Sequence, residues 1–398
     1  MDYNTSHKRL GIYIHIPFCR SKCAYCDFNS APPESDEIVT RYVDALIAHM
    51  ESYRTAAGEY EPDTVFIGGG TPTSLPPEEL YRIVRAVKKN FSLVKNAEFT
   101  IECNPATAEY STFTRLHRMG VNRLSFGLQS AHENELKALS RCHTRKDFAR
   151  SYKMAREAKF DNINVDLMFG IPYQTGTSLA HSIKYVAGMR PEHISLYDLK
   201  IEPNTPFGKE YEKIKPTLPT EDDNADMYFG AIDLLSSLGY RQYEISNFAR
   251  DRKMCAHNLK YWNCDEYLGF GVSAHSYFNG SRFSFTPDIK KYIEGVTIPT
   301  SNVCLTEECE QIDERERMGE YIMLRLRLAS GIDEREFMRR FGFSFEKIFG
   351  EKCEWFIRSG FMTQKNGIYA LTPRGMFVSN YILTEILDFD DTARFNFT

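Results

Sequence analysis

Six short runs of residues that favour β-strands alternate with longer amphipathic stretches through the first half of the chain. The runs cover residues 12–16, 64–67, 98–102, 123–126, 162–169 and 193–197. Apolar residues recur at helical spacing between them, as in 35–53 behind Ser35 as a candidate N-cap. Strand–helix units in a row predict a parallel sheet with helical crossovers. Because a closed barrel needs about eight such units, we predict an α/β fold built on a partial (β/α)6 barrel.

The pattern changes twice after the sixth run. A helix over 221–238 and a strand near 241–245 complete a barrel domain predicted to span 1–245. Residues 246–309 are rich in aromatic residues and glycine and weakly periodic, so we interpret them as a connecting region. In 310–398, three helical stretches precede FMTQKNGIYALT, where Asn366-Gly367 predicts a hairpin turn. Helices followed by a hairpin predict a winged-helix-like C-terminal domain.

Three of the ten cysteines lie together in the segment YIHIPFCRSKCAYCDF. Cys19, Cys23 and Cys26 form a C-x3-C-x2-C motif directly after the first predicted strand. Thiolates are the ligands of iron–sulfur clusters, whereas a structural zinc site uses four protein ligands, usually from two separated pairs. Since the chain has no second pair, the motif predicts a [4Fe–4S] cluster with one iron open to a small molecule. The scattered cysteines are interpreted as small buried hydrophobes.

Charge and hydropathy limit the partners and the location. The net charge of −5 gives no general attraction to nucleic acid. Residues 310–398 carry 13 Lys and Arg against 15 Asp and Glu, so the winged-helix-like domain has no basic face for DNA. No apolar run approaches the ~20 residues that span a bilayer, and MDYNTSHKRL contains no secretory signal. We therefore expect a cytoplasmic protein that binds no nucleic acid and whose C-terminal domain covers the barrel mouth or contacts a protein partner.

The cysteine loop after a first strand resembles the radical S-adenosylmethionine (SAM) superfamily. In that superfamily the open iron binds the amino and carboxylate groups of SAM, and reduction of the cluster cleaves SAM to a 5′-deoxyadenosyl radical. The resemblance implies further SAM contacts at the carboxyl ends of later strands, where the loops of such folds build sites. By motif position, the residues implied are Tyr13, Tyr25, Gly70, Thr71, Glu102, Gln129, Arg141 and Asp166.

Longer motifs narrow the resemblance to the oxygen-independent coproporphyrinogen III oxidase group. They are YIHIPFC, GGGTPT, VNRLSFGLQS, NVDLMFGIP and GVSAHS, and the similarity covers nearly the whole chain, including a C-terminal HemN-like helical domain. Two departures argue against decarboxylation. Phe28 stands where the decarboxylating oxidases carry a fourth cysteine, and only a short segment precedes the first strand. In addition, residues 257–262 form an HNxxYW motif, which marks the related HemW family of haem chaperones.

This resemblance implies that the chain binds haem through His257 and delivers it to apoproteins of the respiratory chain. His is a common axial ligand of haem iron, and flanking Tyr and Trp offer flat surface to a porphyrin. Cys255 and His275 are further candidate ligands. An electron donor such as flavodoxin or ferredoxin is implied if SAM is cleaved, and transient membrane association and a homodimer stay open.

Two alternative functions stay open. The closest is a genuine oxygen-independent coproporphyrinogen III oxidase, which forms protoporphyrinogen IX by radical decarboxylation. The other is a radical SAM methyltransferase or haem-cleaving enzyme on the same scaffold.

Overall fold

The computed structural model describes residues 8–250, 252–296 and 305–388, and its main feature is one large sheet. Six strands pair in chain order, each parallel to the next. They are β1 (Lys8–Ile16), β2 (Tyr60–Gly69), β3 (Glu98–Cys103), β4 (Arg123–Gln129), β5 (Ile163–Phe169) and β6 (His193–Asp198). All six predicted strands are confirmed.

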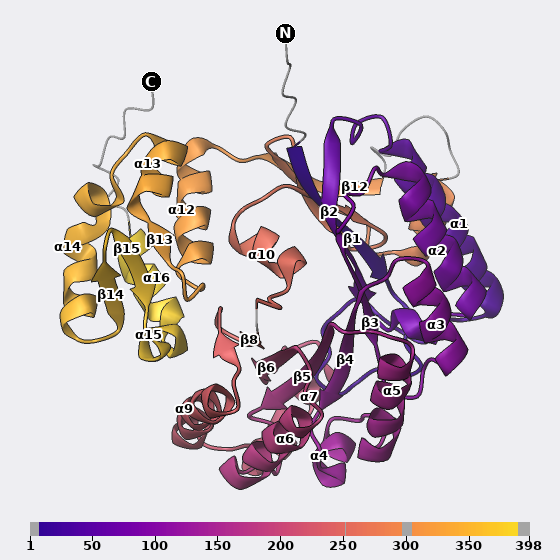
Figure 1. The fold of residues 1–398 in the computed structure, drawn as a ribbon, viewed down its shortest axis with the longest axis horizontal. Helices are drawn as coiled ribbons and strands as arrows, with labels where there is room; N and C mark the ends of the chain where they lie inside the picture. Colours follow the sequence, from indigo (N-terminus) through magenta and orange to yellow (C-terminus); the bar gives the residue numbers. More distant parts are fainter. Residues whose placement is uncertain (1–7, 251, 297–304, 389–398) are drawn as a thin grey trace.

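Helices connect these strands and cover the outer face of the sheet (Figure 1). They are α1 (Asp36–Ser52), η1 (Pro72–Ser74), α2 (Pro77–Asn90), α3 (Tyr110–Arg118), α4 (Glu133–Ala138), α5 (Arg145–Glu157) and α6 (Gly176–Gly188). After β6 come α7 (Pro206–Lys209), α8 (Tyr211–Ile214), η2 (Lys215–Thr217) and α9 (Glu221–Ser237). Ser35 caps α1 as predicted, because its hydroxyl accepts a hydrogen bond from the Ile38 amide at 3.3 Å.

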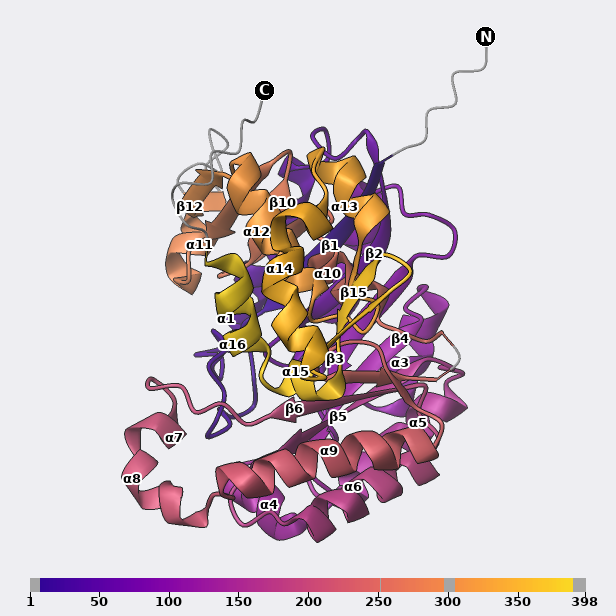
Figure 2. The ribbon, with the colours of Figure 1, turned by 90° about the vertical axis from the view of Figure 1, so that its left-hand side faces the viewer.

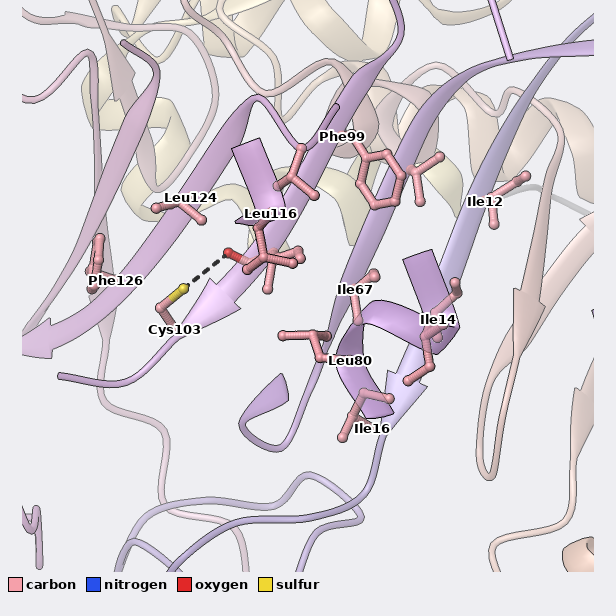
Figure 3. Close-up of a cluster of buried hydrophobic side chains, with 14 of the residues drawn as sticks. Ile12, Ile14, Ile16, Ile67, Leu80, Phe99, Cys103, Leu116, Leu124 and Phe126 are labelled. Carbon is pink, nitrogen blue, oxygen red and sulfur yellow. Dashed lines mark hydrogen bonds between the residues drawn. The ribbon is translucent and has the colours of Figure 1, made fainter. Parts of the chain in front are cut away.

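The main core lies between the sheet and the outer helices. Ile12, Ile14 and Ile16 alternate along β1 and are fully buried against this helical layer (Figure 3). Since successive side chains of a strand point to opposite faces, Tyr13 and His15 face the barrel interior instead. β1 therefore supplies the core with one face and the interior with the other.

The sheet extends beyond the six predicted strands at both edges. Next to β1, β9 (Tyr267–Phe270) pairs in parallel, and β10 (His275–Phe278), β11 (Ser281–Phe285) and β12 (Thr306–Gln311) follow in antiparallel order. Next to β6 lie β8 (Asn247–Ala249) and β7 (Arg241–Gln242), both antiparallel. β7 confirms the strand predicted near 241–245, whereas the weak periodicity of residues 246–309 does not predict β8 to β12. Three of the four residues of β9 are buried, so it lacks the two-residue alternation that marks a half-exposed strand.

The C-terminal residues form a second core around a small antiparallel sheet in the order β13-β15-β14. The strands are β13 (Ile332–Asp333), β14 (Met362–Lys365) and β15 (Ile368–Leu371), and the helices are α12 (Glu314–Arg325), α13 (Glu334–Phe341), α14 (Phe345–Arg358), α15 (Pro373–Phe377) and α16 (Ser379–Leu387). The predicted hairpin turn is confirmed, with φ of 56° at Asn366 and 77° at Gly367.

Two further helices pack against the large sheet or its outer helices. α10 (Ala256–Trp262) lies between the large sheet and the C-terminal helices, and it contacts both β2 and α12 (Figure 1). α11 (Ile289–Val296) packs against α1. The C-terminal elements lie on the opposite side of the sheet from α1 and α2, as the second view also shows (Figure 2). They therefore face the barrel interior.

Nine cysteines in the described ranges are free thiols. Cys304 lies outside the described residues. The same holds for residues 1–7 of the N-terminal segment MDYNTSHKRL, in which no secretory signal is predicted. No helix in the described part of the chain has both the length and the apolar composition that crossing a bilayer requires.

Candidate cluster and SAM site

The loop after β1 carries the three clustered cysteines and is held at two places. At its base, the Ala31 amide donates to the Pro17 carbonyl at 3.0 Å, and the Cys19 amide donates to the Ala31 carbonyl at 3.1 Å. In its middle, the Ala24 amide donates to the carbonyl of Leu139 at 3.2 Å. These hydrogen bonds fix the loop to the carboxyl end of the strands.

A pocket at this end of the sheet gathers nearly all the residues predicted for the cluster and SAM. Its lining includes Cys19, Cys23, Cys26, Tyr25, Gly70, Thr71, Glu102, Gln129, Arg141 and Asp166. Tyr13 is not part of this lining. Its hydroxyl lies 3.0 Å from His15 Nδ1, and its ring packs against Phe66 deeper in the barrel.

The glycines after β2 allow the backbone to pass close to the cysteine loop. Gly69 has a φ of +104°, and a Cβ there would lie 2.4 Å from a ring carbon of His15. A Cβ on Gly70 would lie 2.6 Å from the carbonyl oxygen of Phe18. The Gly70 amide instead donates to the Ile16 carbonyl at 2.7 Å. Only glycine fits here, and the exposed backbone leaves room for a ligand to approach.

Arg141 joins the cysteine loop to the strand ends. Its Nη1 donates to Cys23 Sγ at 3.4 Å, and its Nη2 donates to Asn104 Oδ1 and to the Gly127 carbonyl, both at 2.6 Å. Its Nε is buried without a described partner. This guanidinium lies where it can offset the negative charge of cysteine thiolates or of a carboxylate on a bound ligand.

Asn104 is a site residue that the sequence analysis does not select. Besides accepting from Arg141, it donates to Thr71 Oγ1 at 2.7 Å, and that hydroxyl lies 3.5 Å from Cys19 Sγ. The available signal is its position two residues after Glu102, in the same strand-end segment ECNP. Asn104 therefore connects two of the predicted SAM residues to each other.

Two carboxyl groups share the pocket. Glu102 accepts from the Gly69 amide at 3.0 Å, and burial, together with the nearby Asp166, raises the pKa of Glu102 to about 8. Asp166 accepts from Asn164 Nδ2 at 2.7 Å and from the Ser125 hydroxyl at 3.4 Å, and burial also raises its pKa. The pair is thus suited to a ligand that brings positive charge or hydroxyl donors.

Two further pocket residues have unusual surroundings. Gln129 ends β4 in the left-handed region, with a φ of 70°, next to an irregularity in the pairing of β4 with β5. Strained backbone of this kind is concentrated at binding sites. Burial raises the pKa of the Tyr25 hydroxyl, which keeps it as a neutral donor beside the cysteines.

Three cysteine thiols on one loop are a donor set that suits an iron–sulfur cluster. Among the described residues, no three His, Cys, Asp or Glu side chains converge on one ion position. A cubane has several irons, so each thiolate needs to reach only its own iron. Cys103 also borders the pocket, but its thiol lies in the core and donates to the Ile101 carbonyl at 3.7 Å (Figure 3). Phe28 is 65% exposed at the position of the missing fourth cysteine. The residues present therefore fit a cluster with three protein ligands.

The predicted haem ligand His257 belongs to α10 and is buried between this helix and β2. Only 1% of its surface is exposed, and its two ring nitrogens lie 2.9 Å from the Thr64 hydroxyl and 2.9 Å from the Tyr261 hydroxyl. Burial, with the nearby Lys260 adding to it, lowers the pKa of His257 to about 3. In the described conformation both nitrogens are therefore engaged within the protein.

Cys255 and His275, the other candidate haem ligands, also lie outside the pocket that the three clustered cysteines line. Cys255 is fully buried with its thiol 3.5 Å from Glu98 Oε1, and His275 is exposed at the start of β10.

A second cavity, of about 660 Å³, is lined by Asn258, Tyr261 and Trp262 of the HNxxYW motif. This cavity lies between the ends of β5 and β6, α9, α10 and the C-terminal helices, and its volume is typical of cofactor sites.

Two known protein families match different parts of the chain. Residues 13–186 match the Radical SAM superfamily, and residues 312–378 match the HemN C-terminal domain. The chain is 35% identical to the heme chaperone HemW of Bacillus subtilis over 379 residues, which cover 94% of this chain and 98% of that protein. It is 32% identical to the heme chaperone HemW of Escherichia coli, over 94% of this chain and 97% of that one. The chain belongs to the HemW family.

The solved structures show the fold of this HemW-family protein. Coproporphyrinogen III oxidase (HemN) from Escherichia coli, a radical SAM enzyme, superposes with a TM-score of 0.84 over 96% of this chain and 92% of that one, at 22% identity. This confirms the predicted partial barrel with a C-terminal helical domain. The matched radical SAM domain implies a [4Fe–4S] cluster and SAM, and the pocket described above fits both.

Proposed function

We propose that this HemW-family protein is a haem chaperone, which binds haem and delivers it to haem-accepting apoproteins such as those of the respiratory chain. The observation that carries the proposal is the cavity of about 660 Å³ walled by Asn258, Tyr261 and Trp262 of the HNxxYW motif. The relatives named heme chaperone, which match nearly the whole chain, support it.

The cluster and SAM belong to the same proposal. Cys19, Cys23 and Cys26 hold the cluster, which when reduced supplies an electron to SAM. The residues that hold SAM are Tyr25, Gly70, Thr71, Glu102, Gln129, Arg141 and Asp166, with Tyr13 behind them in the barrel. Within this set, Arg141 suits the carboxylate of SAM, and Glu102 and Asp166 suit its amino group or ribose hydroxyls. A small electron-transfer protein such as flavodoxin or ferredoxin is the donor if SAM is cleaved.

Coproporphyrinogen III oxidase is the less favoured function. Phe28 stands where a fourth cysteine would be, and the likeness to HemN at 22% identity shows the fold alone. We further place the protein in the cytoplasm, where its nine described free thiols stay reduced. The proposal also includes transient association with a membrane and formation of a homodimer.

His257 is the proposed haem ligand of the loaded state. For its ring to reach iron, the hydrogen bond to Thr64 or the one to Tyr261 must break. Haem binding through this residue therefore requires a local rearrangement, either of α10 against β2 or of the Tyr261 side chain on the same helix. Movement of this kind predicts slow, temperature-dependent binding.

The experiment is a haem titration of the reconstituted protein, followed by mixing with an apo-haem protein. Wild type should bind haem and pass it on. His257→Ala should lose affinity while keeping its iron content, and His275→Ala, which removes an exposed histidine, should behave as wild type. Failure of the wild type to bind haem would refute the chaperone proposal. Unchanged affinity of His257→Ala would refute only the ligand assignment.

A further inference from the structure

A relay of hydrogen bonds crosses the barrel interior from the SAM pocket to the start of α10. It begins at Asp166 on β5, whose Oδ1 accepts from Asn164 Nδ2 at 2.7 Å. Asn164 Oδ1 lies 2.6 Å from His193 Nδ1 on β6, and His193 Nε2 lies 2.8 Å from the Tyr243 hydroxyl. The Tyr243 oxygen accepts from the amide of Cys255, the N-cap residue of α10, at 3.2 Å. The relay therefore connects the cofactor pocket to the helix that carries the HNxxYW motif.

The direction of each hydrogen bond is fixed by the surrounding groups. Both amide hydrogens of Asn164 are used, since its Nδ2 also donates to the Ser125 hydroxyl at 2.7 Å. Its Oδ1 therefore accepts from His193 Nδ1. Burial lowers the pKa of His193 well below its ordinary value, so the ring is neutral and Nε2 accepts from the Tyr243 hydroxyl. Every donor in the relay thus points toward the Asp166 carboxylate.

A relay of this kind transmits a change at its accepting end. Hydrogen bonds in series polarise one another, so a carboxylate at the end strengthens the bonds before it. Water does not interrupt them, because Asn164, His193 and Tyr243 are only 3%, 1% and 8% exposed. A ligand that donates to Asp166 shares the lone pairs of the carboxylate and weakens its bond to Asn164. The later bonds weaken in turn, as far as the one that holds α10.

The relay side chains are fixed by the sheet and by the join to the C-terminal domain. Asn164 and His193 are paired residues of β5 and β6. The Tyr243 amide donates to the Asn247 carbonyl at 3.1 Å, and its carbonyl accepts from the Ala329 amide at 2.9 Å. In contrast, α10 has only seven residues, and helices this short depend on their neighbours for stability. α10 is therefore the element that responds.

Two groups hold the first turn of α10. Glu98 accepts from the amides of Ala256 and His257, both at 3.0 Å, and Tyr243 accepts from the amide of Cys255. Of these two groups, Tyr243 is the one that leads to the SAM pocket. Weakening its hydrogen bond loosens α10, while Glu98 keeps the helix in place.

We propose that this relay couples the SAM pocket to α10, so that SAM bound at Asp166 loosens the helix that carries the HNxxYW motif. Since His257 reaches iron only after a local rearrangement at α10, SAM regulates haem uptake in this way. The inference rests on the SAM site and the haem-chaperone function proposed above. Asn164, His193 and Tyr243 line neither pocket, so they are positioning residues.

The test is hydrogen–deuterium exchange of the reconstituted full-length protein with and without SAM, measured on peptides that cover α10. SAM should speed exchange in α10 about 2- to 10-fold, as expected if each bond of the relay weakens by about 10–30%. Exchange in α1, which lies on the outer face of the sheet, should not change. Haem binding to the same samples should be faster with SAM.

Three variants locate the effect in the relay. Tyr243→Phe keeps the ring and removes the hydroxyl, so exchange in its α10 should not respond to SAM. The matched control is Tyr240→Phe, because Tyr240 is also buried but donates to the Pro191 carbonyl at 2.8 Å, outside the relay. This control should keep the full response. Asp166→Asn removes the charge at the accepting end and should speed exchange in α10 without SAM.

A SAM response that persists in Tyr243→Phe would overturn the proposal, as would unchanged exchange in Asp166→Asn. SAM binding to wild type, measured by equilibrium dialysis, without a change in α10 would also overturn it. If α10 responds to SAM but haem does not bind, the coupling is supported and the chaperone function fails. If SAM does not bind, the proposed SAM site fails and the coupling fails with it.

Discussion

Replacing Gly70 by Ala tests the contact between the end of β2 and the cysteine loop. The added Cβ would lie 2.6 Å from the Phe18 carbonyl oxygen and 2.8 Å from the Ile16 carbonyl oxygen. Both are backbone atoms, so β2 and the loop must move apart. Overpacking of this kind costs about 1–3 kcal/mol. The hydrogen bonds from the Gly70 and Thr71 amides, at 2.7 and 2.8 Å, also weaken, and each contributes about 1 kcal/mol. We expect a loss of about 2–4 kcal/mol.

The assay is urea unfolding of the apoprotein, compared at an unchanged m-value, followed by anaerobic reconstitution and iron analysis. Gly70→Ala should be less stable and should take up less iron, because its cysteine loop is displaced. The control is Gly230→Ala in α9, where a Cβ would meet no heavy atom within 4 Å. Removing glycine from a helix there should stabilise the protein by about 0.5–1 kcal/mol. Wild-type stability and iron content in Gly70→Ala would refute the reasoning.

Three further variants test other parts of the site and fold. Cys23→Ala should lose the brown cluster absorbance, whereas Cys142→Ala, which removes an exposed thiol, should keep it; full iron in Cys23→Ala would contradict the ligand set. The pKa of Glu102 rises from an ordinary value of 4.5 to about 8 in the folded protein. At pH values between these two, the Glu102 carboxyl is protonated in the folded state and ionised in the unfolded chain. Apoprotein stability should therefore fall as pH rises through this window, by on the order of 4 kcal/mol relative to Glu102→Gln. Parallel pH profiles of the two proteins would show that the carboxyl is not desolvated. Gly367→Ala should cost about 1 kcal/mol in urea unfolding because this position needs a positive φ, and a neutral effect would argue against the tight hairpin turn.

The parallel strands and the cysteine site could be predicted because their signals are local. Each of the six strands is a short segment with consecutive or alternating apolar residues, and the cysteines lie within one loop. The glycines after β2 and the acids at later strand ends gather at one pocket because parallel strands end at the same edge of the sheet.

The environment of His257 could not be predicted because it depends on distant strands. Its ring nitrogens meet Thr64 of β2 and Tyr261 of its own helix, and its ring packs on Phe66. Nothing in the sequence around His257 shows that α10 lies on β2. The same holds for β9, whose pairing with β1 is set by tertiary contacts rather than by its own pattern. The cavity lined by Trp262 likewise requires segments more than a hundred residues apart in sequence.

The most direct test of the central claim is an anaerobic assay of the reconstituted protein with SAM, a reductant and coproporphyrinogen III, with haem binding measured on the same preparation. The account predicts that haem binds while coproporphyrinogen is not consumed. Sustained decarboxylation to protoporphyrinogen IX without haem binding would contradict it and would show that Phe28 does not prevent oxidase chemistry.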